Sequence, residues 1–266
     1  MDSEEISGTE AAPGGAKATD TVLRLLWRAR LGEKAGRRGP RRKVSVDQIV
    51  DAGIALADAD GLASFSMRRV AERVGLSPMS LYSYVPDRSS LIGLMIDQTV
   101  GRTPLPEHTG TLRERLRALS RLLWDEYHRH PWLLDAQSHR PWIGPHVSAR
   151  YEWQLCALEG CGLDDLAMDH TVSLLASHAA ASAQDALRAR HLEESSGTSD
   201  LEWWSANAPV LAEVMPPGAF PVSGRVGSAV GEAYQAVTNT TAVYEFGLEV
   251  ILDGIETRVR RGRGGS

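Results

Sequence analysis

Three helix starts between residues 44 and 81 share one pattern of apolar and polar positions. In each, a serine stands where a helix N-cap belongs, with an apolar residue one position before it and another four positions after it. The serines are Ser45, Ser66 and Ser77, and the flanking pairs are Val44 with Ile49, Phe65 with Val70, and Leu76 with Leu81. Such a pair packs across the first turn and fixes the direction in which the chain enters the helix. The pattern therefore predicts three short helices in immediate succession.

Glycine and proline positions predict where these helices end. Gly61 stands where a C-terminal glycine stops the first helix, and Gly75 stops the second. The third helix has Pro78 at its first position and cannot pass Tyr84, because the residue before Pro86 is pushed out of the α region. The second and third helices are thus about two turns long and joined at a glycine. Such a pair is a helix-turn-helix.

The third helix could bind DNA, or it could simply pack as part of a three-helix unit. Away from its apolar side it carries small, polar or amphipathic residues and no acid, namely Met79, Ser80, Ser83 and Tyr84. Side chains of this kind suit a helix that enters a DNA major groove. A unit that only packs needs neither so short a helix nor an outer face without Glu and Asp. The pattern therefore favours DNA binding, although short helix pairs also occur elsewhere.

The stretch SMRRVAERVGLSPMSLYSYVPDR at residues 66–88 resembles the DNA-binding domain of TetR-family transcriptional repressors. The stretch FGLEVILDGIE at residues 246–256 is similar to the last helix of the tetracycline-repressor-like branch. The basic N-terminal extension at residues 1–43, called the leader below, also resembles the leaders of actinomycete members of that branch. Several of those members control antibiotic export. The resemblance implies an all-α fold, in which a three-helix helix-turn-helix domain precedes a helical ligand-binding and dimerisation domain.

The resemblance also implies which residues contact DNA. Arg68 matches a position from which an arginine can bind a guanine edge through two N–H groups. The family often has histidine where this chain has Tyr84. The groove-facing positions correspond to Pro78, Met79, Ser80 and Ser83, the phosphate-facing positions to Tyr82, Tyr84 and Arg88, and the cap positions to Ser66 and Ser77.

Residues 1–43 are predicted to form a flexible basic extension. Residues 1–20 are too poor in apolar side chains to fold alone, whereas the apolar patch at 22–27 predicts a short helix that docks on the body. The run KAGRRGPRRK at 34–43 is basic and broken by Gly and Pro. One interpretation is a solvated linker. We favour the other, in which the run contacts the minor groove and ends with Arg41, Arg42 and Lys43 beside the first helix.

The rest of the chain is also predicted to be helical. Helices are expected at 87–100, 111–130, 147–161, 164–191, 201–214 and 240–260. The segment 193–200 is expected to be a polar loop, and 216–231 to be irregular because Pro and Gly interrupt it. The predicted domains are the extension 1–43, the helix-turn-helix domain 44–101 and the ligand-binding and dimerisation domain 102–266.

The last predicted helix carries two apolar stripes. Val243, Gly247, Val250 and Gly254 form one stripe, and Leu248, Ile251, Leu252, Ile255 and Val259 form the other. A surface helix needs one stripe to meet its own core, so the second stripe indicates a partner. Together with the Ala- and Ser-rich helix at 164–191, it predicts a two-fold homodimer joined by a four-helix bundle.

The second half of the chain is rich in tryptophan and histidine. A pocket for a flat, partly apolar ligand has such walls and a few polar groups, although each such residue alone is more often part of a core or an interface. Because the resemblance implies a ligand-receiving domain here, we single out five candidate ligand-binding residues. They are Trp132, His139, Trp142, His178 and Asp185.

Composition and spacing argue against several other classes of protein. The net charge of −5 gives no global sign of nucleic-acid binding. Cys156 and Cys161 lack the spacing of a metal site and are expected to be buried thiols, and no nucleophile stands in a pattern with a base. We expect no metal, no cofactor and no enzymatic activity. No apolar run is long enough for a signal peptide or a membrane span, so a cytoplasmic protein is expected.

These features together predict a ligand-responsive transcriptional repressor. It would bind a palindromic operator in double-stranded DNA as a homodimer and be released by a small-molecule inducer. An antibiotic or a related metabolite that controls an efflux gene is the inducer we expect. The alternative is a DNA-binding activator, or a regulator that has no small-molecule ligand.

Overall fold

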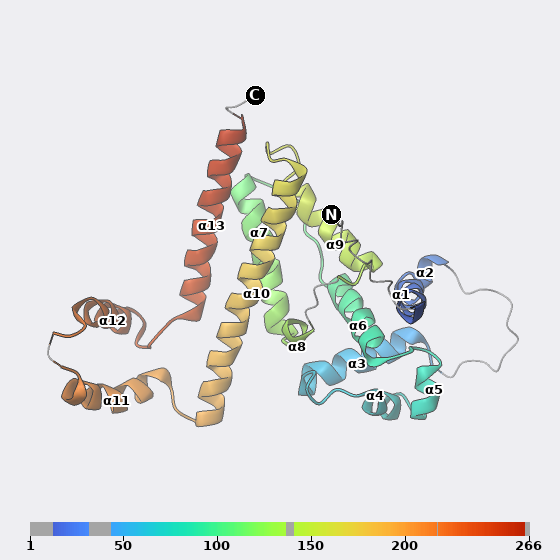
Figure 1. Ribbon diagram of the computed structural model, residues 1–266, viewed down its shortest axis with the longest axis horizontal. Helices are drawn as coiled ribbons and strands as arrows, with labels where there is room; N and C mark the ends of the chain where they lie inside the picture. The colour runs from blue at the N-terminus through green and yellow to red at the C-terminus, as the bar shows by residue number, and fades with distance from the viewer. Residues whose placement is uncertain (1–12, 32–43, 137–140, 217, 264–266) are drawn as a thin grey trace, which may run out of the picture. The chain divides into compact units, whose positions relative to one another are not determined.

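The computed structural model describes residues 13–31, 44–136, 141–216 and 218–263, and every regular element in these ranges is a helix (Figure 1). The predicted all-α fold is therefore confirmed. Contacts divide the chain into two compact units, Met1–Pro106 with Asp135–Trp153, and Glu107–Leu134 with Gln154–Ser266. Residues 135–153, which the sequence analysis placed in the second domain, thus associate with the first unit.

The first unit holds the predicted helix-turn-helix. Its helices are α1 (Pro13–Leu26), α2 (Arg28–Leu31), α3 (Val46–Asp60), α4 (Met67–Arg73), α5 (Pro78–Tyr82) and α6 (Arg88–Arg102), and α9 (Pro145–Cys156) begins in it. We call α3 to α6 the head. All three predicted serine caps are confirmed, because Ser45, Ser66 and Ser77 each accept a hydrogen bond from the backbone N–H three residues later. Figure 1 shows α4 and α5 following one another along one edge of the head.

The helices α4 and α5 are both shorter than the sequence indicated. The helix α4 ends at Arg73, and Gly75, with φ +69°, turns the chain so that the Leu76 N–H donates to the Ala71 carbonyl at 2.9 Å. The helix α5 ends at Tyr82 because the next two N–H groups bond to carbonyls only three residues back. Leu81 and Val85 are fully buried on its inner side. The turn and the core thus fix α5 in the head.

The leader forms more structure than expected. The helix α1 begins at Pro13, so residues 13–20, which were expected not to fold alone, belong to a helix that docks on the body. Val22 and Leu26 are buried, and α1 lies against α6, as the predicted docking requires. The Trp27 indole N–H donates to the Ile143 carbonyl at 2.9 Å, and Arg28 pairs with Asp47 at the start of α3. The apolar patch at 22–27 therefore contacts the core, and this contact stabilises α1, which extends beyond the patch to Pro13.

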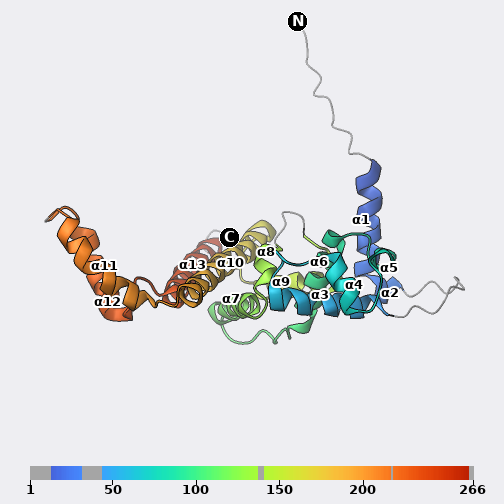
Figure 2. The same cartoon turned by 90° about the horizontal axis from the view of Figure 1, so that it is seen from below.

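The second unit is built on three neighbouring helices. Its elements are α7 (Leu112–Arg129), most of α8 (Trp132–Asp135), α10 (Asp165–Ser196), α11 (Asp200–Val214), α12 (Pro221–Tyr234) and α13 (Thr240–Arg263). Figure 2 shows α7, α10 and α13 side by side, nearly end-on. Their shared core is fully buried and consists of Leu116, Leu119, Leu175, Leu248 and Leu252. On its rim Arg113 of α7 pairs with Glu249 of α13 at 2.6 Å and with Asp253 at 2.8 Å.

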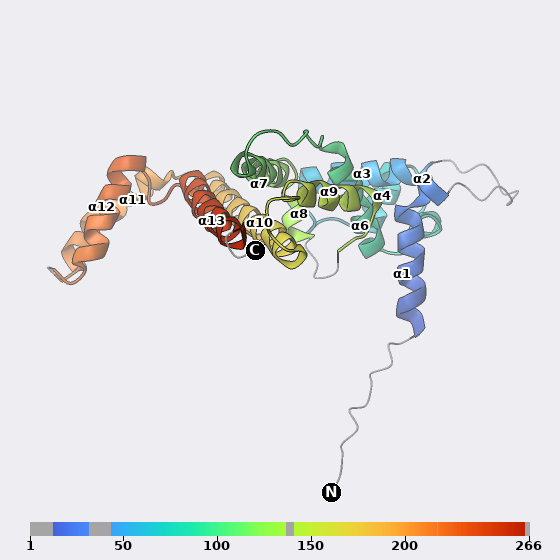
Figure 3. The same ribbon diagram turned by 90° about the horizontal axis from the view of Figure 1, so that it is seen from above.

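Several predicted boundaries in this half are wrong. The helix α10 continues to Ser196, through part of the predicted loop, because no breaker occurs before Gly197 (φ +65°). The helix α12 forms where an irregular segment was expected, since Pro221 occupies its first position, where a missing N–H has no cost. The helix α9 ends at Cys156, which is exposed, so only Cys161 is a buried cysteine. Figure 3 shows α11 and α12 extending away from the three central helices of their unit.

Candidate functional site

The outer face of α5 is exposed and free of acidic side chains. Met79 has an exposed fraction of 81%, Tyr82 is about half exposed, and Ser80 and Ser83 are exposed. Pro78, which begins the helix, is exposed as well. A helix anchored by Leu81 that presents such residues can approach a groove without repelling phosphate. The five predicted contact residues of α5 and its C-cap therefore share one accessible surface.

The serine hydroxyls on this surface are partly used within the head. Ser77 accepts the Ser80 N–H at 3.2 Å, and the two hydroxyls lie 2.8 Å apart. The Ser83 hydroxyl donates to the Ser80 carbonyl at 2.6 Å. The Ser80 and Ser83 hydroxyls each keep at least one lone pair, so these two serines can still accept a hydrogen bond from a base. Ser77 has a structural function as the α5 cap, as Ser66 has for α4.

The arginines of α4 differ in their partners. The Arg68 Nε donates to Glu72 Oε1 at 2.8 Å, and both side chains are mostly exposed. The hydrogen bond and the nearby Glu72 charge raise the pKa of Arg68 above its ordinary value, so it stays a cation. Arg69 instead donates to the Ser64 carbonyl at 3.1 Å and pairs with Asp60. Arg68, the predicted base reader, therefore lies on the outside of α4, whereas Arg69 ties the helix to the head.

Arg88 has an intramolecular role that the sequence did not reveal. It donates to the Leu62 carbonyl at 2.8 Å, and its guanidinium lies 5.6 Å from the centre of the Phe65 ring. These contacts join the start of α6 to the turn before α4. Arg88 is nevertheless exposed, and Tyr84, four residues earlier, is half-buried. Their phosphate contacts stay predictions.

A carboxylate on α6 caps the start of α9. Asp97 is 95% buried, and its Oδ1 accepts the N–H groups of His146 at 3.0 Å and Val147 at 2.9 Å. Gly144 precedes this helix and has no side chain to cap it, and a Cβ there would lie 2.2 Å from the Asp97 Oδ1. Burial raises the pKa of Asp97 above its ordinary value. The two backbone donors and the nearby His146 act in the opposite direction, but their effect is smaller than that of burial. Asp97 thus supplies from another helix the cap that Gly144 cannot.

Two glycines of α6 receive ring side chains from the same segment. A methyl group on Gly93 would lie 2.5 Å from the Trp142 ring, and one on Gly101 would lie 2.5 Å from the His146 ring. Gly93, Asp97 and Gly101 are spaced four residues apart, so they share one face of α6. That spacing of small residues was the sequence signal for a close contact, and the sequence analysis missed it. Trp142, a predicted ligand residue, is used in this contact.

The other predicted ligand residues have different surroundings. Trp132 is 1% exposed, and His178 donates to the Tyr244 carbonyl at 3.0 Å while stacking on the Tyr244 ring at 5.5 Å. Asp185 is exposed and lies 3.8 Å from Arg188. His139 lies outside the described residues, as do Arg41, Arg42 and Lys43 in the leader. Trp142 belongs to the first unit, whereas Trp132, His178 and Asp185 belong to the second, and the binding role of all five stays a prediction.

The second unit contains a column of stacked rings. Trp124 stacks on Tyr244 at 4.0 Å, with 20° between the rings, and His128 adjoins Trp124 at 4.3 Å. The Tyr244 hydroxyl lies 2.9 Å from the Ser120 hydroxyl in the interior. A Cβ on Gly247 would lie 2.5 Å from the His178 ring. A side chain at position 247 would therefore collide with His178 within the same subunit.

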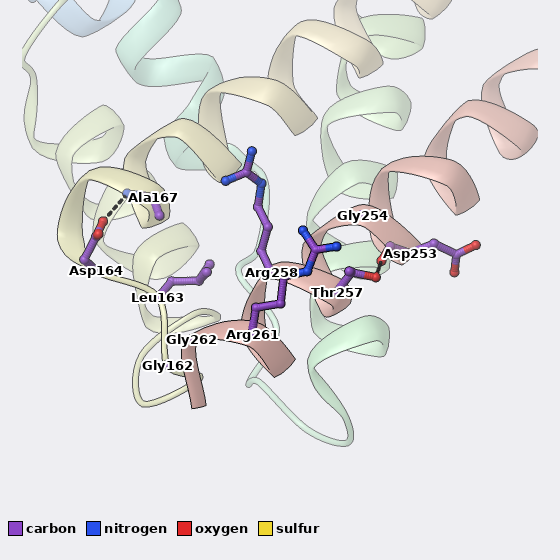
Figure 4. Close-up of a pocket in the computed structure, with 10 residues that line it drawn as sticks. All are labelled: Gly162, Leu163, Asp164, Ala167, Asp253, Gly254, Thr257, Arg258, Arg261 and Gly262. Atoms are coloured by element: carbon purple, nitrogen blue, oxygen red, sulfur yellow. Dashed lines mark hydrogen bonds between the residues drawn. The ribbon is translucent and has the colours of Figure 1, made fainter. Parts of the chain in front are cut away.

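A groove of about 600 Å³ lies where α13 ends beside the start of α10 (Figure 4). Figure 4 shows Arg258 and Arg261 projecting from α13, with Leu163 and Asp164 nearby. Its lining consists of Gly162, Leu163, Asp164, Ala167, Asp253, Gly254, Thr257, Arg258, Arg261 and Gly262. None of Trp132, Trp142, His178 and Asp185 lines this groove.

Comparisons with known proteins identify the family. The family described as "Tetracyclin repressor-like, C-terminal domain" matches residues 103–259. The HTH-type transcriptional repressor DrrR1 of Streptomyces coeruleorubidus is 34% identical over 248 residues, which cover 92% of this chain and 88% of that protein. The chain belongs to the TetR family. An HTH-type transcriptional regulator of Saccharopolyspora erythraea is 35% identical over 135 residues, which cover 49% of this chain and 55% of that protein.

Solved structures of TetR-family proteins share the fold. Apo ActR from Streptomyces coelicolor has a TM-score of 0.66 at 23% identity, covering 83% of this chain and 99% of that chain. ActR in complex with actinorhodin has a TM-score of 0.65 at 24% identity, covering 80% of this chain and 96% of that chain. At this identity the likeness shows the fold alone.

Membership of the TetR family decides the class of activity. The chain is a transcriptional repressor of this family and not an enzyme. Within the residues that the structure describes, no group of three or more His, Cys, Asp or Glu side chains is placed to hold a metal ion. Across the same residues, no helix combines the length and the apolar character needed to cross a bilayer.

Proposed function

We propose that this TetR-family repressor binds a palindromic operator as a homodimer, inserts α5 of each protomer in the major groove, and is released by a small-molecule inducer. The observation that carries the proposal is the outer face of α5, exposed and without acid on a helix anchored by buried Leu81 and Val85. Two such helices related by a two-fold axis would bind half-sites about one DNA turn apart.

The proposed DNA contacts divide into base and phosphate contacts. Arg68 would read a guanine edge, and Pro78, Met79, Ser80 and Ser83 would line the groove. Tyr82, Tyr84 and Arg88 would bind phosphates, and Arg41, Arg42 and Lys43 would follow the neighbouring minor groove. Base contacts confer sequence preference, whereas phosphate contacts strengthen binding to every sequence.

The homodimer is supported by apolar side chains that no contact within the described chain covers. Val243, Phe246 and Val250 of α13 have exposed fractions of 58%, 73% and 55%, whereas Leu248 and Leu252 on the other side are fully buried. The helices α11 and α12 have no buried residue, yet they expose Trp203, Trp204 and Val222, and the α12 N-cap residue Phe220 is exposed as well. An exposed apolar area of this extent marks an interaction surface.

The ligand is proposed to be an antibiotic or a related metabolite whose efflux the repressor controls. Support comes from ActR, which shares the fold and has been crystallised with actinorhodin. The ring column of Trp124, Tyr244 and His178 offers a flat wall in the second unit, although Tyr244 itself is 1% exposed. A bound ligand releases DNA only to the extent that it prefers the conformation with the wrong half-site spacing. We place the protein in the cytoplasm, where it would meet DNA.

Footprinting on the DNA that flanks the protein's own gene tests this function. We expect protection of an inverted repeat, and loss of that protection with one compound from a panel of antibiotics and related metabolites. Transcription from the protected promoter should rise with the same compound. A fall in transcription when the protein is deleted would instead support the alternative, an activator.

A further inference from the structure

An acidic residue lies on the reading side of α4, directly beside the predicted base reader. Arg68 and Glu72 are four residues apart, and the Arg68 Nε donates to Glu72 Oε1 at 2.8 Å. Their side chains have exposed fractions of 79% and 58%, so neither belongs to the core. The buried side of α4 is formed by Met67, Val70 and Ala71.

The stability of α4 does not explain Glu72. The helix ends at Arg73, so this carboxylate lies in the last turn, where the helix dipole disfavours negative charge. An exposed ion pair contributes little stability, and the order with arginine before glutamate is the weaker one. A carboxylate on a DNA-facing surface also repels phosphate. The position therefore has costs for folding and for general DNA affinity.

The geometry of the pair suits base reading. Glu72 engages the Nε of Arg68, and within the described residues the two terminal nitrogens of the guanidinium make no other hydrogen bond. Those two nitrogens are the pair that can bind O6 and N7 of a guanine together. An arginine held at its Nε loses less side-chain freedom on binding and reaches fewer phosphates.

We propose that Glu72 is a specificity-determining residue, which orients Arg68 toward a guanine and weakens binding to DNA that lacks this guanine. The inference rests on the proposed operator binding by the head. It predicts that removing the carboxylate strengthens binding to random DNA while reducing the preference for the operator. If Glu72 had a purely structural role, its removal would not strengthen binding to random DNA while reducing the preference for the operator.

The test compares protein variants on three duplexes. The first duplex is selected by the wild-type protein from a random pool. The second is the same duplex with the guanine read by Arg68 replaced in each half-site, and the third is unrelated in sequence. Each protein is titrated with each duplex at one salt concentration. The proteins are wild type, Glu72→Ala, Glu72→Gln, Arg68→Ala and the double variant with alanine at both positions. Glu194→Gln is the matched control, because Arg190 and Glu194 form an exposed pair with the same order and spacing on α10.

For Glu72→Ala we expect about threefold tighter binding to the unrelated duplex and roughly tenfold less discrimination against the replaced guanine, within the range of one bidentate contact. Glu72→Gln, which keeps a neutral acceptor, should retain part of the discrimination. In the double variant the glutamate substitution should have no further effect on discrimination. Glu194→Gln should match wild type.

The outcomes separate this inference from the proposed function. If Arg68→Ala relaxes the preference and Glu72→Ala does not, the inference on Glu72 is overturned and base reading by Arg68 stands. If Arg68→Ala leaves the preference unchanged, base reading by Arg68 is overturned together with the inference. Thermal unfolding of each variant shows whether the head is intact.

Discussion

Substitution of Asp97 tests how the start of α9 is held against α6. In Asp97→Ala the N–H groups of His146 and Val147 lose their acceptor in a site where Asp97 is 95% buried. Loss of an N-cap costs about 0.5–2 kcal/mol, and each buried donor left unpaired costs about 1–3 kcal/mol. Because Gly144 can admit water once the side chain is gone, we expect a loss of about 2 kcal/mol in the free energy of unfolding.

Asp97→Asn separates the hydrogen bonds from the charge. Both N–H groups bond to the same oxygen, Oδ1, so an asparagine carbonyl can replace it. We therefore expect Asp97→Asn to lie within about 1 kcal/mol of wild type at neutral pH. Urea unfolding at one fixed protein concentration measures both variants, because a dimer's stability depends on concentration. Equal losses for the alanine and asparagine variants would refute the capping argument.

The pKa of Asp97 adds a dependence on pH. Burial raises the pKa in the folded protein above that of the unfolded chain. The protonated form is therefore favoured by folding, and this stability is fully present below the ordinary aspartate pKa and lost as the pH rises through the raised value. Relative to Asp97→Asn, wild type should become less stable as the pH rises through this window. A wild type that gains stability relative to Asp97→Asn as the pH rises would contradict the cause we assign to the shift.

Three further predictions follow from other contacts. Phe246→Asp places a charge in the exposed stripe of α13, so light scattering should show monomers. Wild type and the control variant Phe246→Leu should give dimers, and a dimer of the Asp variant would refute this interface. Tyr244→Phe leaves the Ser120 hydroxyl unpaired in the core and should cost about 1–2 kcal/mol in urea unfolding, and an unchanged midpoint would contradict the buried hydrogen bond. Trp27→Phe removes the donor to the Ile143 carbonyl and should speed amide exchange in α1 without weakening DNA binding, whereas unchanged exchange would mean that this bond does not hold α1.

Local rules predicted the head well because its helix starts depend on neighbouring residues. The caps at Ser45, Ser66 and Ser77, the proline at the start of α5 and the glycine turn at Gly75 all involve contacts within a few positions of the chain. The same holds for the cap of α7, where Thr111 and Glu114 form a capping box three residues apart.

The sequence did not reveal features that depend on distant partners. The contact of Trp142 with Gly93 and the cap by Asp97 join segments about fifty residues apart. The spacing of Gly93 and Gly101 indicates a close contact on α6, but it does not indicate which segment makes that contact. Trp142 therefore looked like a pocket residue. The close contact of Gly247 with His178 on another helix was missed for the same reason. The helix α12 was missed because three glycines lower helix propensity without forbidding a helix that proline starts.

Selection of duplexes from a random pool, followed by measurement of the mass of the selected complex, tests the central claim most directly. The account predicts one enriched inverted repeat, with half-site centres about one turn apart and two protomers on each duplex. Enrichment should disappear when Ser80 of α5 and its C-cap residue Ser83, both exposed, are replaced by glutamate. A pool with no enriched sequence, or an enriched site that has no repeat and binds one protomer, would contradict it.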